Sequence, residues 1–101
     1  MIIYNVTIKV DPNIHEQWLL WMKNEHIPEM LQTKLFCKYQ MVRLLEVDED
    51  DGPTYAVQYY ANNISDYQQY ISGFSDLLRK KSTDRWGDQI VAFRSVMEVI
   101  H

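Results

Sequence analysis

His26 is the residue whose position in this chain most suggests chemistry. It follows Trp18 and Met22 at intervals of four residues, so that all three lie on one face of an expected helix. His26 falls near the carboxyl end of that helix, where the helix dipole favours a charged imidazole. A histidine in this place can act as a general acid or base near neutral pH. The alternative is a structural histidine that caps the helix or is held in the core by a hydrogen bond.

A second set of polar and aromatic side chains falls on expected strands. Arginine beside tyrosine and glutamine can orient a small anion or a flat ring. The alternative for Arg94 is an ion pair with Glu98 at a subunit interface, where arginine and tyrosine are common. Aromatic residues are also frequent in cores and interfaces because each buries a large area. The candidates for lining a ligand pocket are Tyr4, Trp18, Met22, Arg43, Gln58, Tyr60 and Arg94.

The other reactive side chains do not form a metal or cofactor site. The acidic run Asp48–Asp51 lacks the spacing and the distal glutamate of a calcium loop, so that it reads as a solvated hairpin tip. The three histidines have no metal-ligand spacing. Cys37 is the only cysteine, and an inert thiol is the default interpretation. We therefore expect no metal and no cofactor.

Two strand patterns and a helix pattern account for the first half of the chain. Residues 1–10 alternate apolar and polar types, which predicts a strand. Asp11 and Pro12 are typical of a helix start. The helix should run to about His26 and break or kink near Ile27, because Pro28 disfavours helical geometry in the residue before it. Residues 36–47 and 54–61 then read as two strands of a hairpin that is joined by the acidic turn 48–53.

The second half predicts one helix and one strand. Ser65 and Gln68 have capping-box spacing, and Gly87 is a plausible helix end. Gly73 is a mild weakness inside this helix. Its apolar stripe comprises Tyr67, Tyr70, Ile71, Phe74, Leu77 and Leu78. Residues 90–100 form the last expected strand, in which Val91, Phe93, Met97 and Val99 alternate with Arg94 and Glu98.

The resulting order βαββαβ is typical of an α+β, ferredoxin-like domain with a four-stranded antiparallel sheet and both helices on one face. The 101 residues suit a single domain over residues 1–101. The helix-free sheet face should present Asn5, Thr7, Ala56, Gln58, Tyr60, Ala92, Arg94 and Val96. This face is too apolar for water and too polar for a lone core, and a two-fold copy of the chain would cover it.

Charge and hydropathy exclude several partners. The net charge is -4 and the basic residues form no stripe, which excludes a nucleic-acid footprint. The same acidity disfavours docking on an anionic membrane. No apolar run of about 18 residues exists to span a membrane. Residues 1–10 lack the apolar core of a signal peptide, so that a cytoplasmic location is expected.

Several stretches resemble a family of roughly hundred-residue bacterial proteins, domain-of-unknown-function family 4286. They are Tyr4-Asn5-Val6-Thr7, the motif Trp18-x-x-Trp21-Met22-x-x-x-His26-Ile27-Pro28, Arg43-Leu44-Leu45, the run from Asp51 to Tyr59, and Val91-Ala92-Phe93-Arg94. The family is similar in architecture to the dimeric α/β-barrel superfamily, which includes cofactor-free monooxygenases, muconolactone isomerase, haem-degrading enzymes and stress-response domains. The resemblance implies a dimer with a pocket between helices and sheet, but no particular reaction. Relatives carry histidines where this chain has Phe74 and Ser82.

Three functions remain open from the sequence. The first is a module that binds a small apolar or aromatic molecule, and the second is a structural dimer without a ligand. The third is a cofactor-free enzyme, monooxygenase- or isomerase-like, that acts on a small aromatic or enolisable substrate with His26 handling the proton. No nucleophile with its base, phosphate loop or carboxylate pair is present, so that binding or structure is favoured over catalysis.

Overall fold

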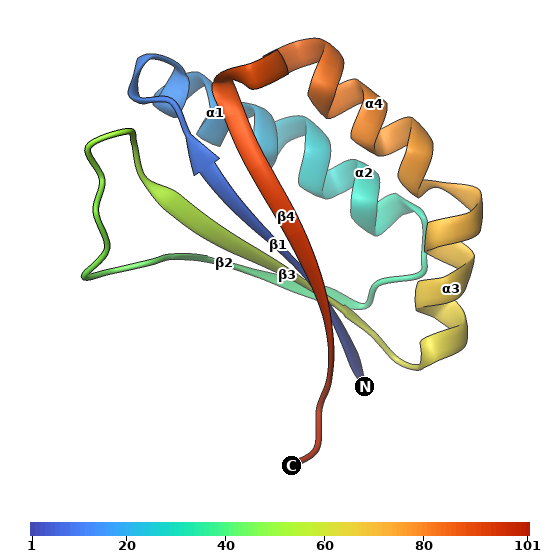
Figure 1. Cartoon of the computed structure of the whole chain (residues 1–101). Coiled ribbons are helices and arrows are strands. Elements are labelled where there is room, and N and C mark those ends of the chain that lie inside the picture. Colours follow the sequence, from blue (N-terminus) through green and yellow to red (C-terminus); the bar gives the residue numbers. More distant parts are fainter.

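The computed structural model describes all residues from 1 to 101. Its antiparallel sheet has the strand order β2-β3-β1-β4, formed by β1 (Ile2–Val10), β2 (Lys38–Arg43), β3 (Thr54–Ala61) and β4 (Ile90–Glu98). The helices cover one face of this sheet and leave the other face open (Figure 1). The predicted α+β, ferredoxin-like fold is therefore confirmed.

The central strand β1 places its apolar residues beneath the helices. Tyr4, Val6, Ile8 and Val10 are buried, and the first three pair with Tyr59, Val57 and Tyr55 of β3. Successive side chains point to opposite faces of a sheet, so that Asn5 and Thr7 lie on the helix-free face, as predicted. The core therefore fills the space between the sheet and the helical layer.

The first helical segment runs through Pro28 without a full break, but its α-helical geometry is interrupted just before Ile27, where a break or kink was predicted. It consists of η1 (Pro12–Ile14), α1 (His15–Trp21), the π-helical segment η2 (Met22–His26) and α2 (Ile27–Gln32). At the end of η2 the Ile27 N–H bonds to the Met22 carbonyl, five residues earlier rather than four. Proline lacks an N–H and collides with the preceding turn of a regular helix, and the wider π turn lets the chain pass it.

The second helical segment is divided where a single helix was predicted. It forms α3 (Ile64–Gly73) and α4 (Ser75–Trp86), because Phe74 leaves helical geometry beside the weak former Gly73. Asn63 rather than Ser65 caps α3, and Gly87 ends α4 as predicted. The break shifts the buried face of α4 to Ser75, Leu78 and Trp86, whereas Phe74 and Leu77 are exposed.

Strand β4 has the opposite phase from the one predicted. The register pairs Val6 with Arg94 and Ile8 with Ala92, so that Ala92, Arg94 and Val96 face the helices rather than the open face. Val91, Phe93 and Met97 take the helix-free face, where Phe93 is 65% exposed. The apolar half of this strand therefore faces away from the core.

In the hairpin between β2 and β3, strand β2 is shorter than predicted and the connection that follows it is longer. β2 ends at Arg43 rather than continuing to Val47, and Glu46 adopts a positive φ of 58° in the connection. Gly52, in the same connection, also has a positive φ. None of the helices has the length and apolarity needed to cross a membrane.

Candidate functional site

The hydroxyl group of Tyr4 is the focus of the polar groups between the sheet and α4. Arg79 of α4 donates to it from a terminal guanidinium nitrogen at 3.0 Å, and Arg94 of β4 donates from Nε at 3.1 Å. Neither arginine forms an ion pair with a carboxylate. Two cations therefore meet at one hydroxyl group without a negative partner from the chain.

His26 lies near this pair at the end of the π-helical segment. Its ring stacks on Trp21, with the centroids 4.8 Å apart and the planes 17° from parallel. Burial lowers the pKa of His26 from 6.5 to about 4, and the charges of Arg94 and Lys81 add to this effect while Glu29 opposes it. The imidazole is thus neutral at pH 7, which corrects the expected preference for the charged form at a helix end.

These groups border one small enclosed space, here called the inner cavity. Its volume is about 30 Å³, which matches the share of about one water molecule. It has no room for a porphyrin, and the residues around His26 therefore do not fit a haem. A second hollow of about 190 Å³, here called the outer depression, adjoins it, since the two share Arg79, Ser82, Ile90, Ala92 and Arg94.

The inner cavity is surrounded by hydrogen-bond donors that have no partner. Trp18 Nε1, Arg79 Nε and the Tyr59 hydroxyl are buried and unpaired, and all three residues line this space. Burial raises the pKa of Tyr59, so that its hydroxyl group keeps its proton. Because buried polar groups are nearly always paired, such a concentration indicates a place where a bound molecule or water completes the bonding.

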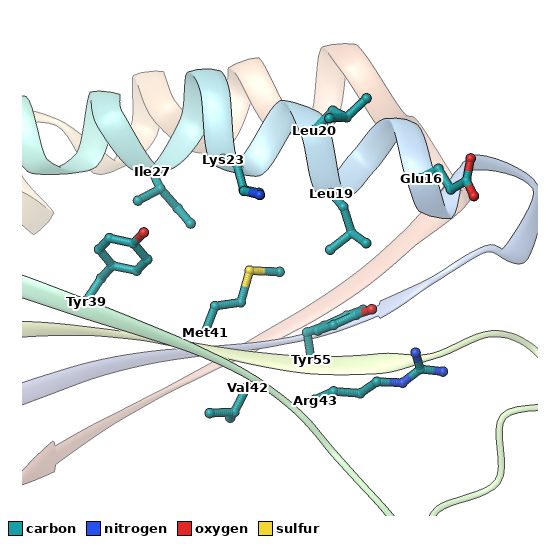
Figure 2. Close-up of a pocket in the computed structure, with 10 residues that line it drawn as sticks. All are labelled: Glu16, Leu19, Leu20, Lys23, Ile27, Tyr39, Met41, Val42, Arg43 and Tyr55. Atoms are coloured by element: carbon teal, nitrogen blue, oxygen red, sulfur yellow. The ribbon is translucent and has the colours of Figure 1, made fainter.

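A larger apolar groove lies between α1–η2 and the edge strand β2 (Figure 2). Its volume is about 830 Å³, and its walls include Leu19, Leu20, Ile27, Tyr39 and Met41. The volume suits a ligand, and specific binding also needs polar groups that are held in place to orient it.

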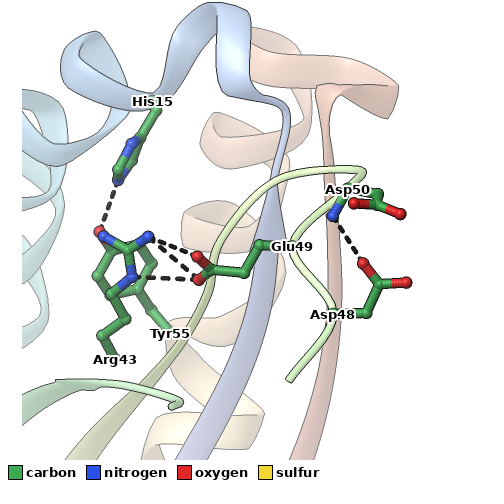
Figure 3. Close-up of polar contacts among 6 residues, drawn as sticks. All are labelled: His15, Arg43, Asp48, Glu49, Asp50 and Tyr55. Carbon is green, nitrogen blue, oxygen red and sulfur yellow. Dashed lines mark hydrogen bonds and ion pairs between the residues drawn. The ribbon is translucent and has the colours of Figure 1, made fainter. Parts of the chain in front are cut away.

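The polar groups at one end of this groove already pair with one another (Figure 3). His15 Nε2 contacts the Tyr55 hydroxyl group, and Arg43 binds Glu49 with guanidinium-to-carboxylate distances of 2.9 to 3.2 Å. The Arg43 hydrogen bond lowers the pKa of the Glu49 carboxyl. The other polar residues of the groove, Glu16, Lys23 and Tyr39, are exposed to solvent, whereas the inner cavity has buried donors without partners. The inner cavity is therefore the better candidate for a specific site.

The structure brings together His26 and four of the seven predicted pocket residues. Tyr4, Trp18, Met22 and Arg94 line the inner cavity with His26. The other three lie elsewhere: Arg43 is at the groove, whereas Gln58 and Tyr60 lie on the helix-free face, where their side chains hydrogen-bond at 3.2 Å. Within the chain Arg94 does not pair with Glu98, and it donates to Tyr4 instead.

Arg79 is the principal residue that sequence reasoning missed. It lies in the run Arg79 to Lys81, which entered the sequence prediction only as part of the overall distribution of basic residues. The signal was the spacing of Ser75, Leu78, Ser82 and Trp86, which places small polar residues on the buried side of α4. Serine at a core position leaves room beside it, and Ser82 lines both hollows.

Acid should destabilise the protein through His26. An unfolded chain binds this proton with a pKa near 6.5 and the folded chain only near 4, so that stability falls as pH drops through that window. The loss reaches about 2 to 3 kcal/mol at pH 4. Urea unfolding at pH 7, 5 and 4 should show a smaller pH dependence in His26→Gln than in the wild type. His101→Gln, at an exposed terminal histidine, is the control that keeps the wild-type dependence. Identical profiles for His26→Gln and the wild type would contradict this prediction.

Comparison with solved structures defines the class of protein as a ferredoxin-like α+β domain. A dimeric ferredoxin-like protein from an uncultured marine organism is 10% identical, with a TM-score of 0.73 over 99% of this chain and 95% of the other. An ethyl tert-butyl ether d (EthD) family protein from Bacillus halodurans is 14% identical, with a TM-score of 0.66 over 99% and 100% of the two chains. At such identities the similarity shows the fold alone.

The sequence family is more specific than the fold. The chain belongs to the family described as a domain of unknown function, DUF4286, whose model matches residues 1–100. Among curated proteins, none matches this chain significantly. No three His, Cys, Asp or Glu side chains are arranged to hold a metal ion.

Proposed function

We propose that this domain binds a small molecule in the inner cavity and the outer depression. The observation that carries the proposal is the set of buried, unpaired donors on Trp18, Tyr59 and Arg79 around one space. Each unpaired buried group costs free energy that a bound partner would recover. The neutral ring of His26 adds a group that can accept a hydrogen bond.

The proposal includes a homodimer formed through the helix-free face. That face carries large exposed apolar side chains on both edge strands, namely Val42, Val91, Phe93 and Met97. An apolar surface of this kind is typical of a protein contact. The marine structural neighbour is described as dimeric, which supports the same assembly here.

Proton transfer by His26 is a second candidate function. The neutral imidazole can accept a proton, but its pKa of about 4 makes it a weak base. The two guanidinium groups would offset this by stabilising an enolate formed next to a carbonyl. Such chemistry needs the same binding site, so that binding is the property to test first.

Binding is tested by titrating the ¹⁵N-labelled protein with a library of small polar and aromatic compounds. We expect bound compounds to shift the amide signals of Ser82, Ala92 and Arg94. Ala92→Met should abolish these shifts, because Ala92 lines both hollows and a longer side chain would fill them. Val91→Met is the matched control, since Val91 precedes Ala92 but is exposed on the opposite sheet face.

A library without a single compound that shifts these signals would refute ligand binding and favour a structural dimer. Shifts that persist in Ala92→Met would place the binding elsewhere, in the groove beside β2 for example. A separate incubation of the protein with the compound in D₂O, followed by ¹H NMR of the compound, adds a test of catalysis, because proton abstraction by His26 would exchange an acidic C–H of the compound and His26→Gln would stop that exchange.

A further inference from the structure

We infer that the ligand is a small monocarboxylate whose charged group is held by Arg79 and Arg94; this rests on the binding function proposed above. The sign of the charge comes from the two guanidinium groups. Both donate to Tyr4, and a neutral hydroxyl group does not balance either charge. No aspartate or glutamate lines the inner cavity or the outer depression.

The carboxylates nearby are engaged with other cations. Glu29, which acts on the charge of His26, is paired with Lys81 at 2.7 Å, and Asp84 of α4 is paired with Lys80 at 2.7 Å. By contrast, Arg43 at the groove has its own carboxylate in Glu49. Arg79 is half-buried and Arg94 is exposed, and no carboxylate of the chain pairs with either of them, so that a bound anion would find both guanidinium groups free of a negative partner.

The site offers hydrogen-bond donors, which suits the same negatively charged ligand that its two arginines favour. A guanidinium has five N–H donors, and each of these two has spent one on Tyr4. Of the remaining guanidinium donors, Arg79 Nε is buried and unpaired, and Trp18 Nε1 and the Tyr59 hydroxyl group add two more unpaired donors. A carboxylate offers acceptors only, and paired N–H groups of arginine match its two oxygens.

The volume limits the size of the ligand. The outer depression has about 190 Å³, or about six water-sized groups, and the inner cavity adds about one. Ile90 and Ala92 line both spaces and offer apolar contact to a short hydrocarbon part. A short branched or unsaturated monocarboxylate fits these limits, whereas a nucleotide or a lipid does not.

The test compares isobutyrate with isobutyramide, which have the same shape but differ in charge. Amide-signal titrations at pH 7 and low salt should show isobutyrate binding at least about tenfold more tightly. Arg79→Gln and Arg94→Gln should each weaken isobutyrate binding by about tenfold or more and leave isobutyramide unchanged. Arg85→Gln is the matched control on the same helix, because its guanidinium stacks on Trp86 instead.

Thermal unfolding of each variant shows whether a loss of binding is a loss of folding, and Arg94→Lys should restore part of the preference for the anion if the variant remains folded. Equal binding of the two compounds, or a preference unaffected by Arg79→Gln, would overturn the inference. Failure of isobutyrate to bind at about 10 mM would also overturn it. In either case, neutral library compounds that still shift Ser82 and Ala92 would leave the proposed binding function standing.

Discussion

Gly52→Ala is expected to lower the free energy of unfolding by about 3 kcal/mol or more. An added Cβ would lie 1.8 Å from the Val10 carbonyl oxygen, and Gly52 has a φ of 117° that side chains rarely adopt. The neighbouring backbone cannot give way easily, because the Val10 N–H is bonded to the Pro53 carbonyl at 2.9 Å. Thermal unfolding followed by circular dichroism should show a midpoint lower by on the order of 15 °C.

Gly73→Ala supplies the matched control for this substitution. A Cβ at Gly73 meets nothing within 4 Å, and the residue lies at the end of α3, where alanine is the better helix former. This variant should unfold at or slightly above the wild-type temperature. If Gly52→Ala unfolded like Gly73→Ala, the close approach of the turn to β1 would be wrong.

Phe93→Asp is expected to raise the dissociation constant of the proposed homodimer by about 100-fold or more. Phe93 is 65% exposed at the helix-free face, and a two-fold interface would contain it twice. The substitution thus removes two aromatic contacts and buries two carboxylates. Sedimentation velocity across a concentration series should show monomer where the wild type is a dimer.

Phe74→Asp tests whether position matters rather than the mere loss of an exposed phenylalanine. Phe74 is 40% exposed, but it lies at the junction of α3 and α4 on the other side of the molecule. Its replacement should leave the dissociation constant unchanged. Dimerisation that survives Phe93→Asp but not Phe74→Asp would assign the contact to the helical side.

The strands and helices that pack one apolar face were predictable from periodicity. β1 alternates cleanly, and the row Trp18, Met22 and His26 does lie toward the sheet. The order βαββαβ then constrained the topology, because sheets of this pattern place both helices on one face. These features need only local spacing, which a sequence displays directly.

The phase of β4 could not be predicted in the same way. Its most apolar set, Val91, Phe93 and Met97, would be assigned to the core by simple alternation, but the core side holds Ala92 and Arg94. Alternation shows which side chains of β4 are apolar. It does not show whether they pack against the helices or against a partner on the helix-free face. If the helix-free face is also covered, as proposed, both sets are explained, and the arginine is inside because it contacts Tyr4.

Only part of the candidate site could be predicted from the sequence, because its residues come from distant segments of the chain. Tyr4 and Arg79 are separated by 75 positions in sequence, and their contact depends on the break at Phe74 that shifts the buried face of α4. No local pattern encodes that shift. The unpaired donors around the inner cavity are likewise a property of packing.

The π-helical turn Met22–His26 contains one more residue than a regular helical turn, and this extra residue sets the direction of the side chains that follow it. Each residue of a helix advances its neighbours by about 100°, so that a regular α-helix through Met22–His26 would have one residue fewer and would point its later side chains elsewhere. A single-codon deletion there would keep the Trp18 end of the helix packed but change the facing of everything after it. Loss of that one residue would therefore change the His26 corner together with the packing of Ile27 and Met30, which are buried after the π turn.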